Sequence, residues 1–270
     1  MTFLRVDKEK CTSCGACSDV CPASLITVGD DGPQESGSRI CISCGHCVAV
    51  CPVDALDNTN APLLGQVVLK DREPIDPLIA ATFLRSRRSI RRYKEEQVPR
   101  EKLLRVLDVA RFASTGGNMQ GLSYLVISEK ETLRRITAAT LDWMTGEVAA
   151  GSERAPYFEG IVRAARETGK DVILRDAPHL IVALCDRDFV RGQENAHFCL
   201  AYAELFAPTV GVGTCWAGLF QGCAFSGYAP LLDVLNVPEG KKVAGALMAG
   251  YPRHKYRRLV DRNPLQVLWR

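Results

Sequence analysis

Apolar residues follow two different patterns along this chain of 270 residues. In some stretches they recur at the three- and four-residue spacing of a helix, and in others they form short continuous runs that are typical of buried strands. The helical stretches are 78–84, 99–113, 130–149, 155–170 and 194–207. The apolar runs are 123–128, 179–185 and 241–251. Helices around a modest sheet predict an α+β fold, as a three-layer α/β/α domain.

The first fifty-seven residues show neither pattern and are dominated by a repeated cysteine motif. "CTSCGACSDVCP" at 11–22 and "CISCGHCVAVCP" at 41–52 both read C-x2-C-x2-C-x3-C-P. In this spacing three cysteines hold one iron–sulfur cluster, and the fourth, followed by proline, holds the other cluster. The motif predicts two [4Fe–4S] clusters, one held by Cys11, Cys14, Cys17 and Cys51, the other by Cys41, Cys44, Cys47 and Cys21.

Zinc is the alternative metal, but it takes four ligands and is usually held by two CxxC pairs or by a CxxC with histidines. His46 is expected to pack beside its cluster because four thiolates per cluster are already supplied. Gly15 and Gly45 are expected to allow tight turns. The segment 3–57 resembles the bacterial two-cluster ferredoxins, yet a free ferredoxin would end near residue 57, and this chain continues.

Charge divides the chain at the same point. Residues 1–57 carry four basic and eight acidic side chains, a net charge of −4, whereas the whole chain carries +3, so the remainder carries +7. The prolines and turn formers after residue 57 indicate a connector. We therefore expect a two-[4Fe–4S] domain at 1–57, a linker at 58–75 and a larger domain at 76–270. The charged start lacks a signal-peptide pattern, and no apolar run is long enough to span a bilayer, so a cytoplasmic location without membrane partners is expected.

Two arginine-rich segments lie at opposite ends of the larger domain. "RSRRSIRR" at 85–92 contains five arginines in eight residues, and "RHKYRR" at 253–258 follows the last expected strand. They could form a solvated basic face or a nucleic-acid surface, but no known nucleic-acid-binding module accompanies them. The alternative is that both converge on one phosphate group, which charge-assisted hydrogen bonds would favour.

Four motifs in the larger domain resemble the nitroreductase family in order and spacing. They are "RRSIRRY" at 87–93, "ASTGGNMQGL" at 113–122, "GVGTCWAG" at 211–218 and "GYPRHKYRR" at 250–258. The resemblance covers about 76–270. It implies a homodimeric α+β flavoprotein that binds FMN at the subunit interface.

The resemblance also implies the residues that contact FMN. The arginine-rich motif and the "K-x-R" pair are expected around the phosphate, Asn118 near the edge of the flavin ring, Gln120 in the loop beside it, and the third motif along the flavin. Two departures are visible: Arg88 stands where some members have histidine, and "ASTGGN" lacks the proline of the commoner "APSAGN". The predicted FMN contacts are Arg87, Arg88, Ser89, Arg91, Asn118, Gln120, Cys215, Trp216, Gly218, Lys255 and Arg257.

Several residues have competing interpretations. Cys215 could be a nucleophile, but its apolar neighbours indicate a small buried residue. The aromatic residues Trp143, Tyr157 and Phe158 fall where the family places a variable lid, and a core role is equally compatible with them. The G-x-G of the third motif lacks the remaining glycine of a dinucleotide fingerprint, so no Rossmann site is expected. No catalytic acid or base is required by the sequence.

The sequence thus predicts an FMN-dependent oxidoreductase that receives electrons through its clusters. Reduced ferredoxin or a similar protein would be the donor, and the substrate would be an electron-poor organic acceptor such as a nitroaromatic or a quinone. One alternative is an electron-transfer protein that relays electrons between protein partners. Another is an NAD(P)H-dependent nitroreductase with auxiliary clusters, and a third is a redox sensor that binds nucleic acid.

Overall fold

The computed structural model describes residues 2–37, 40–69 and 74–270. They form two compact units, one made of residues 1–74 with 117–119, the other of 75–116 with 120–270. The predicted linker at 58–75 contains a short 3-10 turn, η1 (Leu63–Gly65), and its residues 70–73 lie outside the described residues. No helix in the described ranges is both long enough and apolar enough to cross a membrane.

The small unit is built from two similar halves. Its strand β1 (Leu4–Val6) pairs antiparallel with β4 (Leu56–Asn58), and β2 (Ile26–Gly29) forms a hairpin with β3 (Gly32–Glu35). Each cysteine motif contributes one short helix, α1 (Ala16–Asp19) or α2 (His46–Ala49). The small core between them contains Cys17, Ile26, Cys47, Val48 and Leu56.

The larger unit is organised around one four-stranded antiparallel sheet in the order β5-β6-β8-β7. Its strands are β5 (Leu122–Ile127), β6 (His179–Asp186), β7 (Gly213–Trp216) and β8 (Lys241–Gly250). The central strands β6 and β8 are buried over almost their whole length, which explains their continuous apolar runs.

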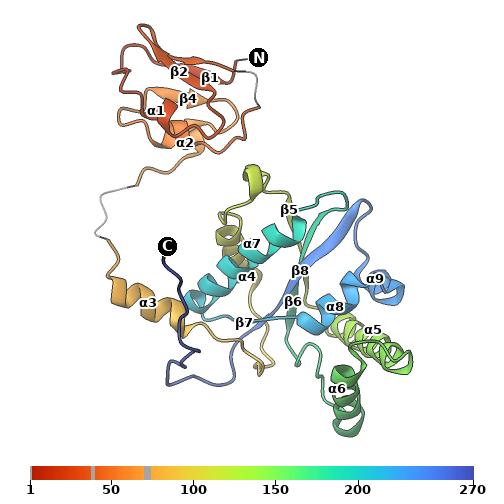
Figure 1. Cartoon of the computed structure of the whole chain (residues 1–270). Helices are drawn as coiled ribbons and strands as arrows, with labels where there is room; N and C mark the ends of the chain where they lie inside the picture. The colour runs from red at the N-terminus through yellow and green to blue at the C-terminus, as the bar shows by residue number, and fades with distance from the viewer. Residues whose placement is uncertain (1, 38–39, 70–73) are drawn as a thin grey trace. The chain divides into compact units, whose positions relative to one another are not determined.

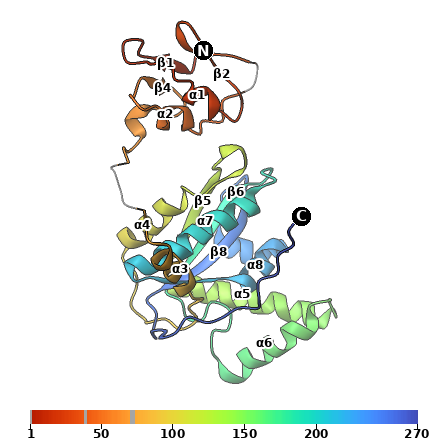
Figure 2. The same cartoon turned by 60° about the vertical axis from the view of Figure 1, so that its left-hand side comes forward.

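Helices cover both faces of this sheet (Figures 1 and 2). One face carries α4 (Arg100–Ala110) and α7 (Gly192–Phe206). The other carries α5 (Lys130–Ala149), α8 (Gly218–Phe225) and α9 (Ala229–Leu235), and α6 (Ala155–Thr168) packs on α5. A separate apolar core fills the space on each side of the sheet. These three layers confirm the predicted α+β, three-layer architecture.

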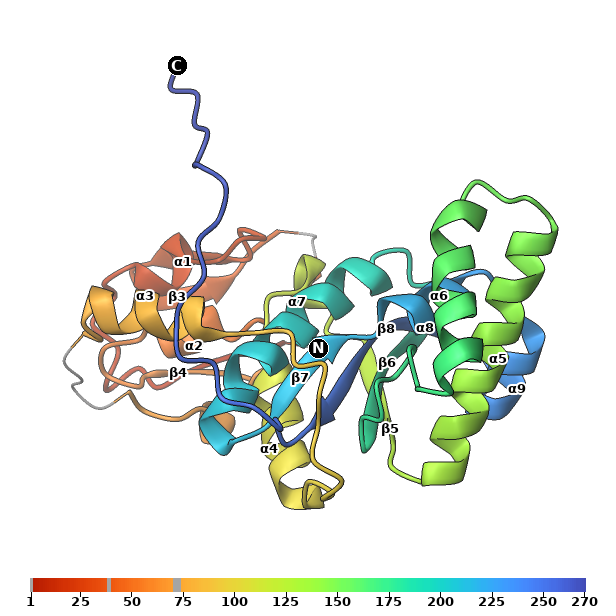
Figure 3. The same ribbon diagram turned by 90° about the horizontal axis from the view of Figure 1, so that it is seen from below.

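The two ends of the larger unit are less enclosed. Helix α3 (Pro77–Ser86) begins at Asp76, whose carboxylate accepts hydrogen bonds from the backbone N–H groups of Leu78 and Ile79, and none of its residues is buried. After β8 the chain has no regular secondary structure, and Figure 3 shows its last residues extending away from the layered body. Exposed apolar side chains remain in both segments.

Most expected elements are present within one or two residues of their predicted ends. Strand β7 and helices α8 and α9 are additions that the sequence pattern did not indicate. Both α8 and the segment that leads into it contain glycine among mostly apolar residues, so neither the helical nor the strand period of apolar positions is evident there.

Candidate functional site

The eight repeat cysteines line two cavities in the small unit, and each cavity takes residues from both repeats. The first cavity brings three cysteines of the first repeat together with Cys51, and the second brings three of the second repeat together with Cys21. The lining thiols are Cys11, Cys14, Cys17 and Cys51 in the first cavity, and Cys21, Cys41, Cys44 and Cys47 in the second.

Glycine residues shape the backbone around these thiols. Gly15 and Gly45 precede the two short helices with φ of 83° and 71°, in the left-handed region where residues other than glycine are strained. The turn directs the following helix so that its second residue, Cys17 or Cys47, is buried. Burial raises the pKa of both of these thiols. A positively charged metal centre would offset the cost of keeping them as thiolates.

Backbone N–H groups point at the fourth cysteine of each repeat, which lines the cavity of the other repeat. The N–H of Leu25 donates to the sulfur of Cys21 at 3.3 Å, and that of Ala55 donates to Cys51 at 3.2 Å. Hydrogen bonds to ligand sulfur are one of the means by which proteins tune iron–sulfur clusters. These two bonds come from equivalent positions of the two repeats, and each reaches the fourth cysteine of its repeat.

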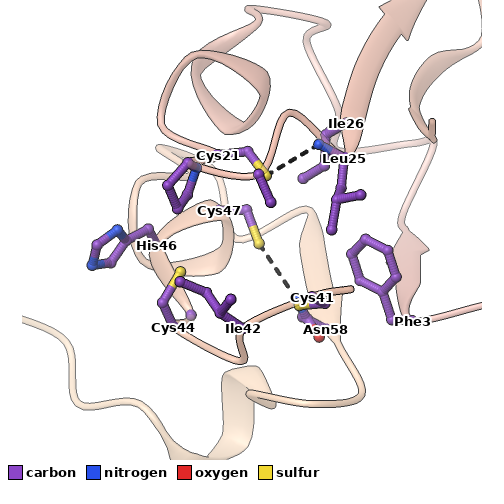
Figure 4. A pocket seen from close by; sticks show the side chains of 13 residues that line it. Phe3, Cys21, Leu25, Ile26, Cys41, Ile42, Cys44, His46, Cys47 and Asn58 are labelled. Carbon is purple, nitrogen blue, oxygen red and sulfur yellow. Dashed lines mark hydrogen bonds between the residues drawn. The ribbon is translucent and has the colours of Figure 1, made fainter. Parts of the chain in front are cut away.

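The arrangement of the thiols fits a cluster of several metal atoms. The thiols are spread over the walls of each cavity, and soft thiolates in that arrangement suit an iron–sulfur cluster. His46 also lines the second cavity, but its side chain is exposed and its ring points away from the sulfur of Cys47 (Figure 4).

A second site forms where the two arginine-rich segments of the larger unit meet. Tyr93 and Pro252 form a β-bridge, and the N–H of Arg253 donates to the carbonyl of Arg92 at 3.0 Å. The N–H of Ile90 donates to the carbonyl of Thr214 in β7 at 2.8 Å. Backbone hydrogen bonds therefore join three of the four sequence motifs.

The side chains of this basic site include an unsatisfied donor. The guanidinium of Arg88 lies 5.3 Å from the centre of the Tyr256 ring, which joins the two arginine-rich segments. Its buried Nε has no hydrogen-bond partner. A buried donor without an acceptor costs about 1–3 kcal/mol, so a bound anion would be stabilised there. Arg91, Lys255 and Arg257 are exposed, and Ser89 is half-buried.

Glu204 of α7 is a member of this site that the sequence reasoning missed. Its carboxylate accepts a hydrogen bond from the indole N–H of Trp216 at 2.5 Å and lies 3.5 Å from Nη1 of Arg87. Only 6% of the Glu204 side chain is exposed, and burial raises the pKa of the carboxyl group, an effect that the Arg87 guanidinium opposes. Arg87, predicted as a phosphate contact, is thus paired with an internal carboxylate.

The third motif supplies backbone rather than reactive side chains. Cys215 lies buried in β7, and burial raises the pKa of its thiol, which is the opposite of what a nucleophilic cysteine requires. Trp216 follows it, half-buried, and the exposed Gly218 begins α8. The structure therefore favours the interpretation of Cys215 as a small buried residue.

The "TGGNMQG" loop has an unusual backbone. Gly117, Asn118 and Gln120 all have φ between 53° and 59°. Its ends are anchored by Asn195, whose side-chain oxygen accepts from the N–H of Gly116 at 3.2 Å, and by Thr115, whose hydroxyl accepts from the N–H of Gln120 at 3.0 Å. Left-handed conformations at residues other than glycine are strained and concentrate at functional sites. Asn118 is half-buried and Gln120 is exposed.

Two of the three aromatic residues considered for a lid belong to the core. Trp143 and Phe158 are buried, and their rings meet edge to face with centres 5.2 Å apart. Tyr157 is exposed. Histidine 179 is also structural, because its Nε2 accepts from the N–H of Val98 at 2.8 Å.

Comparisons with known proteins identify both units. The nitroreductase family model matches residues 84–251, which is more than half of the chain, and the 4Fe-4S dicluster domain model matches residues 3–54. The chain therefore belongs to the nitroreductase family and carries a 4Fe-4S dicluster domain before the family domain. The predicted fusion, fold class and oxidoreductase class are confirmed.

Individual relatives agree with this assignment. An iodotyrosine deiodinase from Thermotoga neapolitana is 22% identical over 62% of this chain and 86% of its own length. A putative NADH dehydrogenase/NAD(P)H nitroreductase from Archaeoglobus fulgidus is 26% identical over 62% of this chain and 82% of its own.

The larger unit shares its fold with an FMN-bound nitroreductase from Bacteroides fragilis, with a TM-score of 0.56, 18% identity and coverage of 72% of this chain and 100% of that one. A Desulfitobacterium hafniense nitroreductase with bound FMN also has a TM-score of 0.56, with 20% identity over 70% of this chain and 97% of that one. The dicluster match and these FMN-bound neighbours support the predicted cofactors, FMN and two [4Fe–4S] clusters.

Proposed function

We propose that this protein is an FMN-dependent oxidoreductase that receives single electrons through two [4Fe–4S] clusters and reduces an electron-poor organic acceptor, such as a nitroaromatic or a quinone, by two electrons. The observation that carries the proposal is the pair of four-thiol cavities in the same polypeptide as a nitroreductase-family domain. In such a chain, the role of a unit that holds iron–sulfur clusters is to supply the electrons that reduce the acceptor.

The residues of the small unit have a defined part in this proposal. The eight thiolates hold the two clusters. Because Cys21 and Cys51 each line the cavity of the other repeat, each cluster is held by both repeats. Cys14 is the exposed thiol of the set, so its cluster has the more direct contact with a partner protein in solution. We place domain 1–57, linker 58–75 and domain 76–270 in the roles of electron input, connection and catalysis.

The larger unit would bind and orient FMN, which when bound accepts and donates electrons one or two at a time. The unsatisfied Nε of Arg88 supports an anion-binding role for the arginine-rich segments. Ser89, Arg91, Lys255 and Arg257 would share the phosphate, while Arg87 is held by Glu204. Asn118 and Gln120 would position the ring edge through their strained loop, and Cys215, Trp216 and Gly218 would line the ring with backbone and indole.

A homodimer is the proposed assembly. Helix α3 leaves Leu78 and Ile79 mostly exposed, and the C-terminal segment leaves Leu268 and Trp269 about nine-tenths exposed. Large exposed apolar groups in these two segments are typical of a surface that a partner covers. A second copy of the chain is the partner that the family resemblance implies.

Reduced ferredoxin or a similar protein is the proposed donor, and Cys14→Ser tests the route. We expect the variant to lose ferredoxin-driven turnover, because one cluster loses a thiolate, while its FMN remains reactive after reduction by dithionite. Cys199→Ser is the matched control: it exchanges the same atoms at a buried position in the other unit and should leave the cluster content unchanged. Unchanged ferredoxin-driven turnover in Cys14→Ser, with normal flavin content, would contradict the proposed route.

The relative from Archaeoglobus favours a second candidate, in which NAD(P)H is the donor. Anaerobically purified protein with counted iron, sulfide and flavin separates the two. We expect reduced ferredoxin to bleach the flavin absorbance, whereas bleaching by NADH or NADPH alone would support the second candidate. A protein that exchanges electrons rapidly with other proteins but reduces no organic acceptor would be an electron carrier instead.

A further inference from the structure

The two cysteine repeats differ at one buried polar residue. Counting seven residues onward from Cys21 gives Val28, and counting seven from Cys51 gives Asn58. Both positions lie in the strand that follows their repeat, β2 or β4. Asn58 is 2% exposed and is one of the few buried polar side chains among the described residues.

The side-chain amide of Asn58 points at two thiols of the second cavity. Its Nδ2 donates to the sulfur of Cys47 at 3.6 Å and to that of Cys41 at 3.8 Å, as Figure 4 illustrates for the pocket. Its Oδ1 accepts from the backbone N–H of Asn60 at 2.9 Å. That bond fixes the orientation of the amide, because the end that faces the Asn60 N–H must be the oxygen.

The first cavity lacks an equivalent side-chain donor among the described residues. Val28 has no polar side-chain atom and packs partly buried against the core that contains Cys17. The first cavity instead receives an additional backbone contact, from the N–H of Ser13 to Cys11 at 3.5 Å, in an exposed position. The buried amide of Asn58 thus distinguishes the second cavity from the first.

We propose that Asn58 raises the reduction potential of the cluster held by Cys21, Cys41, Cys44 and Cys47. The inference rests on the proposed ligation of two clusters. Reduction adds one electron and neither forms nor breaks a bond, so the extra negative charge is shared with the thiolate sulfurs. A hydrogen-bond donor stabilises the more negative state more strongly, and hydrogen bonds to ligand sulfurs are an established determinant of cluster potential. Because Asn58 is buried, little water competes with its N–H groups, and the low local dielectric strengthens the effect.

The functional consequence concerns which of the two clusters an added electron preferentially occupies. With Asn58 present, the second cluster is a better electron acceptor than the cysteine motif alone would make it. Cys14 is exposed, so solvent affects the reduction potential of the first cluster. A comparison of the two wild-type potentials would therefore combine the effect of solvent at Cys14 with the effect of Asn58. Substitution of Asn58 isolates its own contribution.

The test is a redox titration of the complete, cluster-loaded protein, followed by electron paramagnetic resonance. Asn58→Val copies the residue of the other repeat, and we expect it to lower one of the two cluster potentials by the equivalent of about a tenfold change in the reduction equilibrium, which is 59 mV for one electron. The other potential should not move. Asn60→Val is the matched control, because Asn60 is exposed and contributes only its backbone N–H to Asn58, and it should change neither potential.

The outcomes separate this inference from the proposed function. Asn58→Val protein with the iron and sulfide content of two [4Fe–4S] clusters and both potentials unchanged would overturn the role of Asn58 and leave the proposed function intact. Wild-type protein without two such clusters would overturn both. If Asn58→Val fails to retain its clusters, Asn58→Leu, which keeps the shape of the side chain and also lacks the donor, carries the same expectation.

Discussion

Removal of the Glu204 carboxylate should destabilise the larger unit and disturb the proposed flavin site together. The perturbation is Glu204→Ala, which leaves the Trp216 indole N–H without its acceptor and Arg87 without its counter-charge. A donor deprived of its acceptor in a largely buried site costs about 1–3 kcal/mol. The Arg87 side chain is 26% exposed, so water compensates much of the lost ion pair, and we assign about 0.5–1 kcal/mol to it. The expected loss in free energy of unfolding is about 1.5–4 kcal/mol.

The companion substitution Glu204→Gln separates hydrogen bonding from charge. The amide oxygen can still accept from Trp216, and the cost of burying a carboxylate, which raises the pKa of Glu204, disappears. We therefore expect Glu204→Gln to lose no more than about 1 kcal/mol. Trp216→Phe completes the design, because Glu204→Ala should cost about 1–2 kcal/mol less when the indole is already absent.

Urea unfolding followed by circular dichroism, at one fixed FMN concentration, measures these differences. The FMN dissociation constant should rise in Glu204→Ala, since Arg87 and Trp216 both lose their anchor. The reasoning would be refuted if Glu204→Ala unfolded like the wild type, or if its cost were the same with and without the indole.

Two further predictions concern packing and pH. A Cβ atom added at Gly213 would lie 2.5 Å from Cγ1 of Ile90, so Gly213→Ala should cost about 1–3 kcal/mol and displace the arginine-rich segment, whereas Gly146→Ala, with no atom within 4 Å, should be neutral or slightly stabilising. Melting temperatures and retained flavin measure both, and a flavin-replete Gly213→Ala of normal stability would contradict the packing argument. Burial lowers the pKa of His179, which the fold holds neutral as the acceptor for Val98, so stability should fall as the pH drops below the ordinary imidazole pKa. Unfolding measured between about pH 7.5 and 5.5 should show a smaller loss in His179→Gln than in the wild type, and equal losses would exclude this histidine as the cause.

Short-range spacing made the cysteine cavities predictable from the sequence. Each motif places three thiols within seven residues, and the proline after the fourth cysteine indicates that this thiol faces the other cavity. The structure gathers the thiols in the combination that the spacing indicates. From charge alone, convergence of the arginine-rich segments was one alternative beside a solvated basic face; the structure shows their backbones paired, whereas a shared phosphate is a proposal.

Contacts that depend on the tertiary fold were not predictable. Glu204 sits within an apolar helical stretch, 117 residues from Arg87 in sequence, and no local pattern links the two. The lid hypothesis for Trp143 and Phe158 rested on their position in the chain, whereas their burial depends on how α5 and α6 pack together. Asn58 lies just beyond the second motif, and only the fold shows that its amide faces sulfur.

The backbone pairing of residues 90–94 with residues 214 and 251–253 also bears on the order of folding. Residues up to at least 253 must leave the ribosome before the basic site can form, because the segment after β8 makes part of it. The two cysteine cavities use no residue beyond Asn58, and domains generally fold in the order in which they are synthesised. The cysteine cavities can therefore form during synthesis well before the arginine-rich segments meet.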